Sequence, residues 1–171
     1  SADLPSDGPQ VPGIRQQHQL IALEKDCVML LGGKPFSADV VIGEIKEKEA
    51  TVEWRVVQVG GDAPTARRDF NAVVEDGQLI ISGGFDVTGK PLDDIFMLDV
   101  KIDQSEWMWQ CVYSSAGEWM AADKIRSLAV LSKGKFVVLL GTKGGLPCEE
   151  MHVLDHDKLL HSTSVRGKMA T

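Results

Sequence analysis

The densest group of metal-capable side chains lies near the C-terminal end of the sequence. Glu149, Glu150, His152, Asp155 and His156 fall within eight residues. Imidazole and carboxylate groups are the ligands that zinc and iron use in many proteins. If this segment is a strand, Glu150, His152 and His156 share one of its faces. A metal-dependent enzyme with a site around these three residues is therefore one hypothesis that the sequence raises.

A second pattern, Gly84-Phe85-Asp86-Val87-Thr88-Gly89-Lys90, matches the GxxxxGK part of a phosphate-binding loop. Pro91 stands where that loop needs a Ser or Thr to hold magnesium, and Leu92 to Asp99 has the composition of a strand where a helix must follow. We therefore interpret the segment as a surface loop. Ser127 and the three thiols have no base at a motif-defined position, so the sequence predicts no catalytic residue and no cofactor.

The bulk composition is that of a globular domain, with 43% hydrophobic and 25% charged residues in a chain of 171. A net charge of −7 makes nucleic acid and anionic membranes poor partners. The apolar runs are far shorter than the roughly 18 residues that a membrane-spanning helix needs. Three cysteines, far apart and without a CxxC pair, are typical of a reducing compartment, so we expect a cytoplasmic protein.

Three units of one pattern run through the chain, and such self-similarity indicates a repeat architecture. Each unit has an acidic residue ten positions before a bulky apolar one: Glu44 and Trp54, then Asp99 and Trp109, then Asp155 and Val165. Glycines close an apolar stretch in each unit, at Gly32-Gly33, at Gly83-Gly84 and at Gly141. Counted between these glycines, the repeat period is 51 and then 58 residues.

Each unit is predicted to form four short strands. In the second unit these are Phe70 to Glu75, Gln78 to Ser82, Asp94 to Asp99 and Trp107 to Tyr113. β-Branched and aromatic residues crowd the segments, while Gly, Asp, Lys and Pro crowd the gaps. No stretch has a sustained 3.6-residue apolar period. The sequence therefore predicts an all-β protein.

The landmarks resemble the kelch repeat, in which a Pro-x-x-Arg start, a Gly-Gly pair, an acidic residue and a Trp follow one another. The starts are Pro12-Gly13-Ile14-Arg15, followed by His18, and Pro64-Thr65-Ala66-Arg67, followed by Phe70. The third unit departs from the pattern, because Asp123-Lys124-Ile125-Arg126 replaces the start and no Trp follows Asp155. The resemblance implies an all-β fold, a kelch-type β-propeller of four-stranded antiparallel blades.

On this reading residues 1–171 form a single kelch-type propeller segment. Blade 1 covers about 14–60, blade 2 about 66–114 and blade 3, degenerate or truncated, about 125–167. Propellers typically close with four to eight blades, so three blades leave two open faces. We expect the missing blades to come from a longer parent chain, although a second copy of this chain would also supply them.

The resemblance also implies a function, because kelch domains bind proteins through the loops on one propeller face. We expect a non-catalytic interaction module or scaffold that binds a protein or an acidic peptide, in preference to the metal-dependent enzyme. The partner-binding candidates are Arg15, Lys34, Phe36, Arg67, Arg68, Phe85, Asp86, Arg126 and Lys143. Arginine pairs with carboxylates through two hydrogen bonds, and an exposed Phe anchors apolar groups. The alternative for Arg15 and Arg67 is that they are hydrogen-bond donors between blades.

Overall fold

The computed structural model of the chain describes residues 12–75, 77–102 and 106–113, and beyond these only the backbone of five strands between 124 and 168. The described residues contain strands and one short 3₁₀ helix, η1 (Glu47–Glu49), but no α-helix. The all-β prediction is therefore confirmed. No helix within the described ranges has the length and hydropathy to cross a membrane.

Eight strands form two successive four-stranded antiparallel units. The first unit consists of β1 (Gln19–Ala22), β2 (Cys27–Leu31), β3 (Val40–Lys46) and β4 (Thr51–Gly61). The second unit consists of β5 (Asn71–Glu75), β6 (Gln78–Ser82), β7 (Ile95–Asp99) and β8 (Glu106–Tyr113). The strands predicted for the second unit begin within one residue of these positions and end where the structure ends them.

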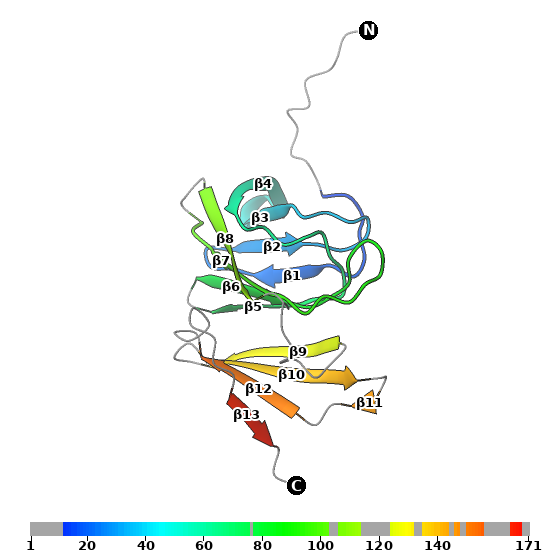
Figure 1. The fold of residues 1–171 in the computed structure, drawn as a ribbon. Coiled ribbons are helices and arrows are strands. Elements are labelled where there is room, and N and C mark those ends of the chain that lie inside the picture. The colour runs from blue at the N-terminus through cyan, green and yellow to red at the C-terminus, as the bar shows by residue number, and fades with distance from the viewer. Residues whose placement is uncertain are drawn as a thin grey trace.

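The last strands of the two units join them into one sheet. Residues 58–61 of β4 pair in parallel with residues 106–109 of β8, which gives the order β1-β2-β3-β4-β8-β7-β6-β5. The edge strands β1 and β5 approach each other, so this eight-stranded sheet is nearly closed (Figure 1). The parallel pairing of β4 with β8 was not predicted from the sequence.

A second sheet of five strands follows the first. It consists of β9 (Lys124–Leu131), β10 (Lys135–Lys143), β11 (Leu146–Pro147), β12 (Glu150–Asp155) and β13 (Val165–Lys168). β9 lies beside β5, so the first strands of the three repeats, β1, β5 and β9, are neighbours in order (Figure 1).

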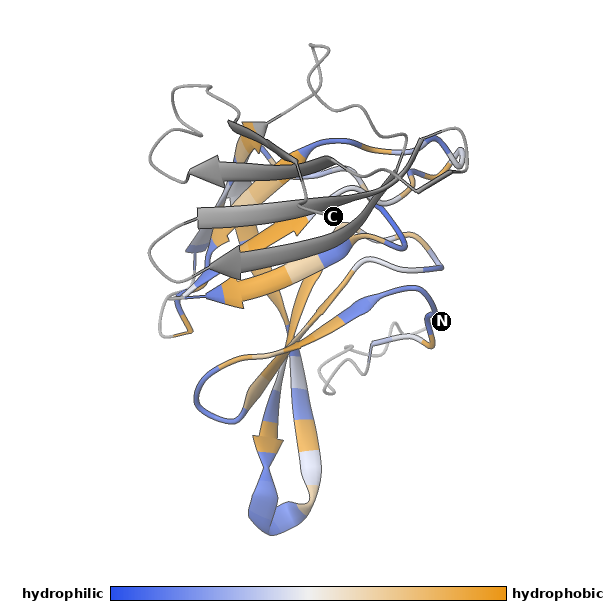
Figure 2. Cartoon of the chain, turned by 90° about the horizontal axis from the view of Figure 1, so that it is seen from below, coloured by the Kyte–Doolittle hydropathy of each residue, from blue (hydrophilic) through white to orange (hydrophobic). Residues whose placement is uncertain are grey.

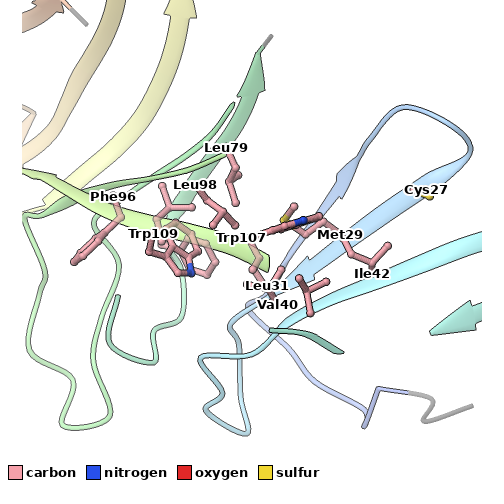
Figure 3. Packing of buried hydrophobic residues seen from close by; sticks show 13 residues of the cluster. Cys27, Met29, Leu31, Val40, Ile42, Leu79, Phe96, Leu98, Trp107 and Trp109 are labelled. Atoms are coloured by element: carbon pink, nitrogen blue, oxygen red, sulfur yellow. The ribbon is translucent and has the colours of Figure 1, made fainter. Parts of the chain in front are cut away.

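The hydrophobic core lies between the two units, and Figure 3 shows side chains from both pointing toward one another. Trp107 is 1% exposed, and its indole N–H donates to the Lys101 carbonyl over 2.9 Å. Trp109 meets Phe96 edge to face, with ring centroids 6.4 Å apart. Hydrophobic residues run along the strands and hydrophilic ones mark the turns (Figure 2). Large aromatic side chains of the second unit, Phe96, Trp107 and Trp109, thus belong to the core that both units share.

The glycine pairs end the second strand of the first two units. Gly32 and Gly33 have φ values of +60° and +98°, in the left-handed region that glycine adopts without strain. A Cβ on Gly32 would lie 2.5 Å from a ring carbon of Phe70 in the second unit. The third unit differs, because β10 continues through Gly141 as far as Lys143. Gly141 therefore does not end a strand as Gly32 and Gly83 do.

Candidate functional site

One end of the strands carries the long loops. These are residues 12–18, 32–39, 62–70 and 83–94, and we call the surface that they form the loop face. They gather at one end of the eight-stranded sheet, opposite the short β1–β2 and β5–β6 turns (Figure 1). Seven of the nine predicted partner-binding residues lie on the loop face: Arg15, Lys34, Phe36, Arg67, Arg68, Phe85 and Asp86. Arg126 lies on β9 and Lys143 on β10, where the structure describes only the backbone.

Arg67 is buried and pairs with a carboxylate and two backbone carbonyls. The residue is 2% exposed, and its guanidinium binds Asp94 through Nη1–Oδ1 and Nη2–Oδ2 distances of 2.5 and 3.0 Å. Its Nη1 also donates to the Gly83 carbonyl over 2.9 Å and its Nε to the Thr65 carbonyl over 3.2 Å. The guanidinium carbon lies 5.3 Å from the Phe96 ring centroid. Such burial favours a structural role over direct contact with a partner.

The side-chain partners of Arg67 all belong to its own unit, so the side chain does not link neighbouring units. The backbone of Arg67 does so, because its carbonyl accepts from the N–H of Gly33 over 2.9 Å. Gln19 adds a second bond between the units, from its Nε2 to the Phe70 carbonyl over 2.6 Å.

Arg15 occupies the same position in the first unit and repeats the backbone contacts of Arg67. Its Nε donates to the Gly13 carbonyl over 3.4 Å and its Nη1 to the Gly32 carbonyl over 3.3 Å. Asp39 precedes β3 just as Asp94 precedes β7. Asp39, however, accepts from the Ser37 hydroxyl over 2.8 Å instead of pairing with Arg15. No carboxylate in the described part of the chain pairs with the half-buried Arg15.

Sequence reasoning singled out both arginines but missed the aspartates. The available signal was the position of Asp39 and Asp94, each one residue before the third strand of its unit.

Arg68 and Phe85 are brought together by a backbone bridge between them. The guanidinium carbon of Arg68 lies 4.9 Å from the Phe85 ring centroid, a cation–π contact. Arg68 Nη1 also donates to Asp69 Oδ2 over 2.7 Å, and Gln17 Nε2 donates to the same oxygen over 2.9 Å. Asp69 thus holds Arg68 against the first unit, and the charge of Arg68 is partly neutralised.

Lys34, Phe36 and Asp86 lie in the loops that follow the glycine pairs. Lys34 is exposed, and its backbone pairs with that of Gln16. Phe36 is half-buried. Asp86 accepts from the hydroxyl of Thr88 over 2.6 Å and from the backbone N–H of Lys90 over 2.9 Å. These bonds, the Thr88 hydroxyl first, lower the pKa of Asp86, so its carboxylate organises the turn.

The segment that matches GxxxxGK is thus a turn held by Asp86, and β7 follows it. The residues of the metal hypothesis are described only in part. Glu150 and His152 lie on β12, while His156 lies outside the described residues. Within the described ranges there is no group of three His, Cys, Asp or Glu residues that could hold a metal ion.

No protein-family model matches the chain. It is similar to the alpha chain of flagellar outer-arm dynein from Chlamydomonas reinhardtii, with 28% identity over 157 residues, which cover 84% of this chain and 3% of that protein. It is also similar to Adagio protein 3 from Arabidopsis thaliana, with 33% identity over 121 residues. The matched segment covers 67% of this chain and 18% of that protein. Adagio-like protein 1 from Oryza sativa subsp. japonica is 33% identical over 69 residues, 40% of this chain and 11% of that protein. The chain thus spans less than a fifth of the length of each of these curated relatives.

Proposed function

We propose that the chain is a segment of a kelch-type β-propeller that acts as a non-catalytic protein-interaction module. Two features support the kelch assignment. The first two units repeat the same hydrogen bonds from the starting arginine to the carbonyl of the first glycine in the pair, over 3.3 Å and 2.9 Å. The similar Adagio proteins carry kelch repeats. In this proposal each four-stranded unit is one blade.

The partner binds the loop face, and Arg15 is the observation that carries this proposal. Arg67 shows that the site after a Pro-x-x-Arg start accepts a carboxylate on two guanidinium nitrogens. In the first unit the same site has the arginine without the carboxylate. A side-chain carboxylate of a partner fits this position, because arginine binds carboxylates through two parallel hydrogen bonds. We therefore propose a protein segment that contains Asp or Glu as the partner.

Residues around Arg15 add to this site. Lys34 lies beside it, because the neighbouring Gln16 bridges to Lys34 through two backbone hydrogen bonds of 2.8 and 3.0 Å. Lys34 adds positive charge, and Phe36, two residues further on, offers a partly exposed apolar ring. The arrangement suits an acidic residue flanked by an apolar one.

An array of random 12-residue peptides, probed with the purified chain, tests this function. We expect the peptides that bind the chain to be enriched in Asp and Glu. Arg15→Ala is expected to weaken their binding at least about tenfold, because a hydrogen bond to a charged group contributes about 1.5–3 kcal/mol. Arg15→Lys is expected to recover only part of the loss, since lysine lacks the planar fork. Arg55→Ala, an exposed arginine on β4 outside the loop face, is the matched control and is expected to bind as the wild type does.

A second variant probes the mechanism of the site. Ser37→Leu removes the hydroxyl that binds Asp39 and frees this carboxylate to occupy Arg15. We expect this variant to bind acidic peptides more weakly although Arg15 itself is intact. Retained peptides without acidic enrichment, or binding unchanged by Arg15→Ala, would contradict the proposed function.

A further inference from the structure

The indole N–H of Trp109 is a buried hydrogen-bond donor. Trp109 is 4% exposed, and within the described part of the chain its N–H has no acceptor. Trp107, two residues earlier in β8, is also buried, but its N–H donates to the Lys101 carbonyl over 2.9 Å. A buried indole N–H usually has a partner, because an unpaired donor has lost its hydration without replacement. Trp109 therefore requires an acceptor that the described residues do not supply.

Trp109 lines a small cavity between the two units. The space for the centre of a water molecule in this cavity is about 20 Å³. The first unit contributes the end of β2 and the loop that follows it, and the second unit contributes the loop before β5 together with β6 and β8. The cavity thus lies where two loops of the loop face, residues 32–39 and 62–70, meet the core that contains Trp109 (Figure 3).

The size of the cavity restricts its occupant to a very small molecule. One water molecule needs about 10–15 Å³ on this measure, so the cavity has room for one water molecule. A metabolite or a peptide side chain of several atoms does not fit into this volume.

The lining of the cavity restricts the charge of the occupant. Much of the wall is apolar, with Leu31 from the first unit and Phe70 and Ile81 from the second. Arg67 is the charged residue of the lining, and its guanidinium already binds Asp94 through two nitrogens. A bound anion would therefore find no unpaired counter-ion among the lining residues. The occupant is small, neutral and able to accept a hydrogen bond.

We propose that the cavity binds one water molecule, which accepts the hydrogen bond of the Trp109 indole N–H. Buried waters typically make about three hydrogen bonds to polar groups that lack other partners. Ser37 from the first unit and Thr65 from the second also line the cavity, and each carries a hydroxyl group. The water joins the two units beneath the loop face. This site depends on the packing of the two units and not on partner binding at Arg15.

Proton NMR of the wild-type chain tests the water site. A long-lived water beside a proton gives cross-peaks of opposite sign in NOE and ROE spectra, whereas exchange of the proton with the solvent gives cross-peaks of the same sign. We expect cross-peaks of opposite sign between water and the indole N–H of Trp109. The indole N–H of Trp107 is the matched control, because it is buried but paired with Lys101, and we expect no such cross-peak for it. Triple-resonance spectra of the wild-type chain assign both signals, so the test needs no variant that has to fold.

A high-resolution crystal structure of the same chain is an independent measurement. We expect one ordered water whose oxygen lies about 2.7–3.2 Å from Nε1 of Trp109. A protein oxygen at this distance would overturn the inference, because the donor would then already be paired. An indole N–H of Trp109 without a water cross-peak, like that of Trp107, would also overturn it. Both measurements use the chain without a partner, so an acceptor that only a bound partner supplies would give this second, negative result.

Discussion

Replacing Asp94 by alanine is expected to destabilise the protein strongly, because it leaves the guanidinium of Arg67 buried without its counter-ion. The two side chains form a bidentate pair in which the side chain of Arg67 is 3% exposed and that of Asp94 17%. Breaking a buried ion pair by removing one partner costs about 3–5 kcal/mol. Arg67 keeps two backbone carbonyl acceptors and the Phe96 ring, and Asp94 is not wholly buried. We therefore expect the lower end of that range, about 3 kcal/mol.

The repeat supplies the matched control. Asp39 stands at the equivalent position but binds Ser37, and it is exposed. Asp39→Ala is therefore expected to cost no more than about 0.5 kcal/mol. For a chain of this size 1 kcal/mol shifts the melting temperature by about 2–4 °C, so Asp94→Ala is expected to lower it by about 6–12 °C.

Differential scanning calorimetry and urea denaturation of both variants measure the effect. Arg67→Met combined with Asp94→Leu is expected to recover much of the loss, because an apolar pair of similar volume removes the uncompensated charge. Equal shifts for Asp94→Ala and Asp39→Ala would refute the reasoning, since they would mean that the pairing of Arg67 contributes nothing to stability.

Three further predictions concern the backbone at Gly32, the turn held by Asp86 and the thiol of Cys27. Gly32→Ala is expected to destabilise the protein more than Gly89→Ala in urea denaturation. Both glycines have positive φ, but only Gly32 has an aromatic ring carbon 2.5 Å from an added Cβ. Equal losses of stability would show that the backbone conformation, and not the clash with the ring, determines the effect. Thr88→Val is expected to raise the pKa of Asp86 toward its ordinary value in an NMR pH titration, because the Thr88 hydroxyl is the main cause of its lowering. The pKa of Asp86 is lower in the folded than in the unfolded chain, so the ionised carboxylate stabilises the fold at pH values above its unfolded pKa. This stabilisation is lost as the pH falls through the folded-state pKa, and we expect Thr88→Val to make that loss smaller. Burial raises the pKa of the Cys27 thiol, so its alkylation by iodoacetamide at pH 8 is expected to be much slower in the folded than in the urea-unfolded chain, and equal rates by mass spectrometry would contradict its burial.

The strands were predictable from sequence because their signals are local. In the second unit, short runs of β-branched and aromatic residues end at glycine and aspartate, and β6 has the predicted bounds of Gln78 and Ser82. The parallel pairing of β4 with β8 was not predictable, because it joins segments far apart in the chain and has no local signature. The expectation that Gly141 closes a strand was wrong for a related reason. A glycine at the expected spacing resembles the strand end at Gly83, but a glycine also fits inside a strand, and β10 runs through it.

The different roles of Arg15 and Arg67 show why the candidate site was only partly predictable. Both arginines follow the same motif and make the same backbone contacts. The residue two positions before each aspartate differs, with Ser37 before Asp39 and Leu92 before Asp94. The leucine side chain offers no hydrogen bond, and the Asp94 carboxylate pairs with Arg67. The Ser37 hydroxyl instead binds the Asp39 carboxylate, which therefore does not pair with Arg15. One hydroxyl therefore separates an arginine that pairs within its own unit from the arginine for which we propose a partner's carboxylate. Reading the motif without its neighbours assigns both arginines the same role.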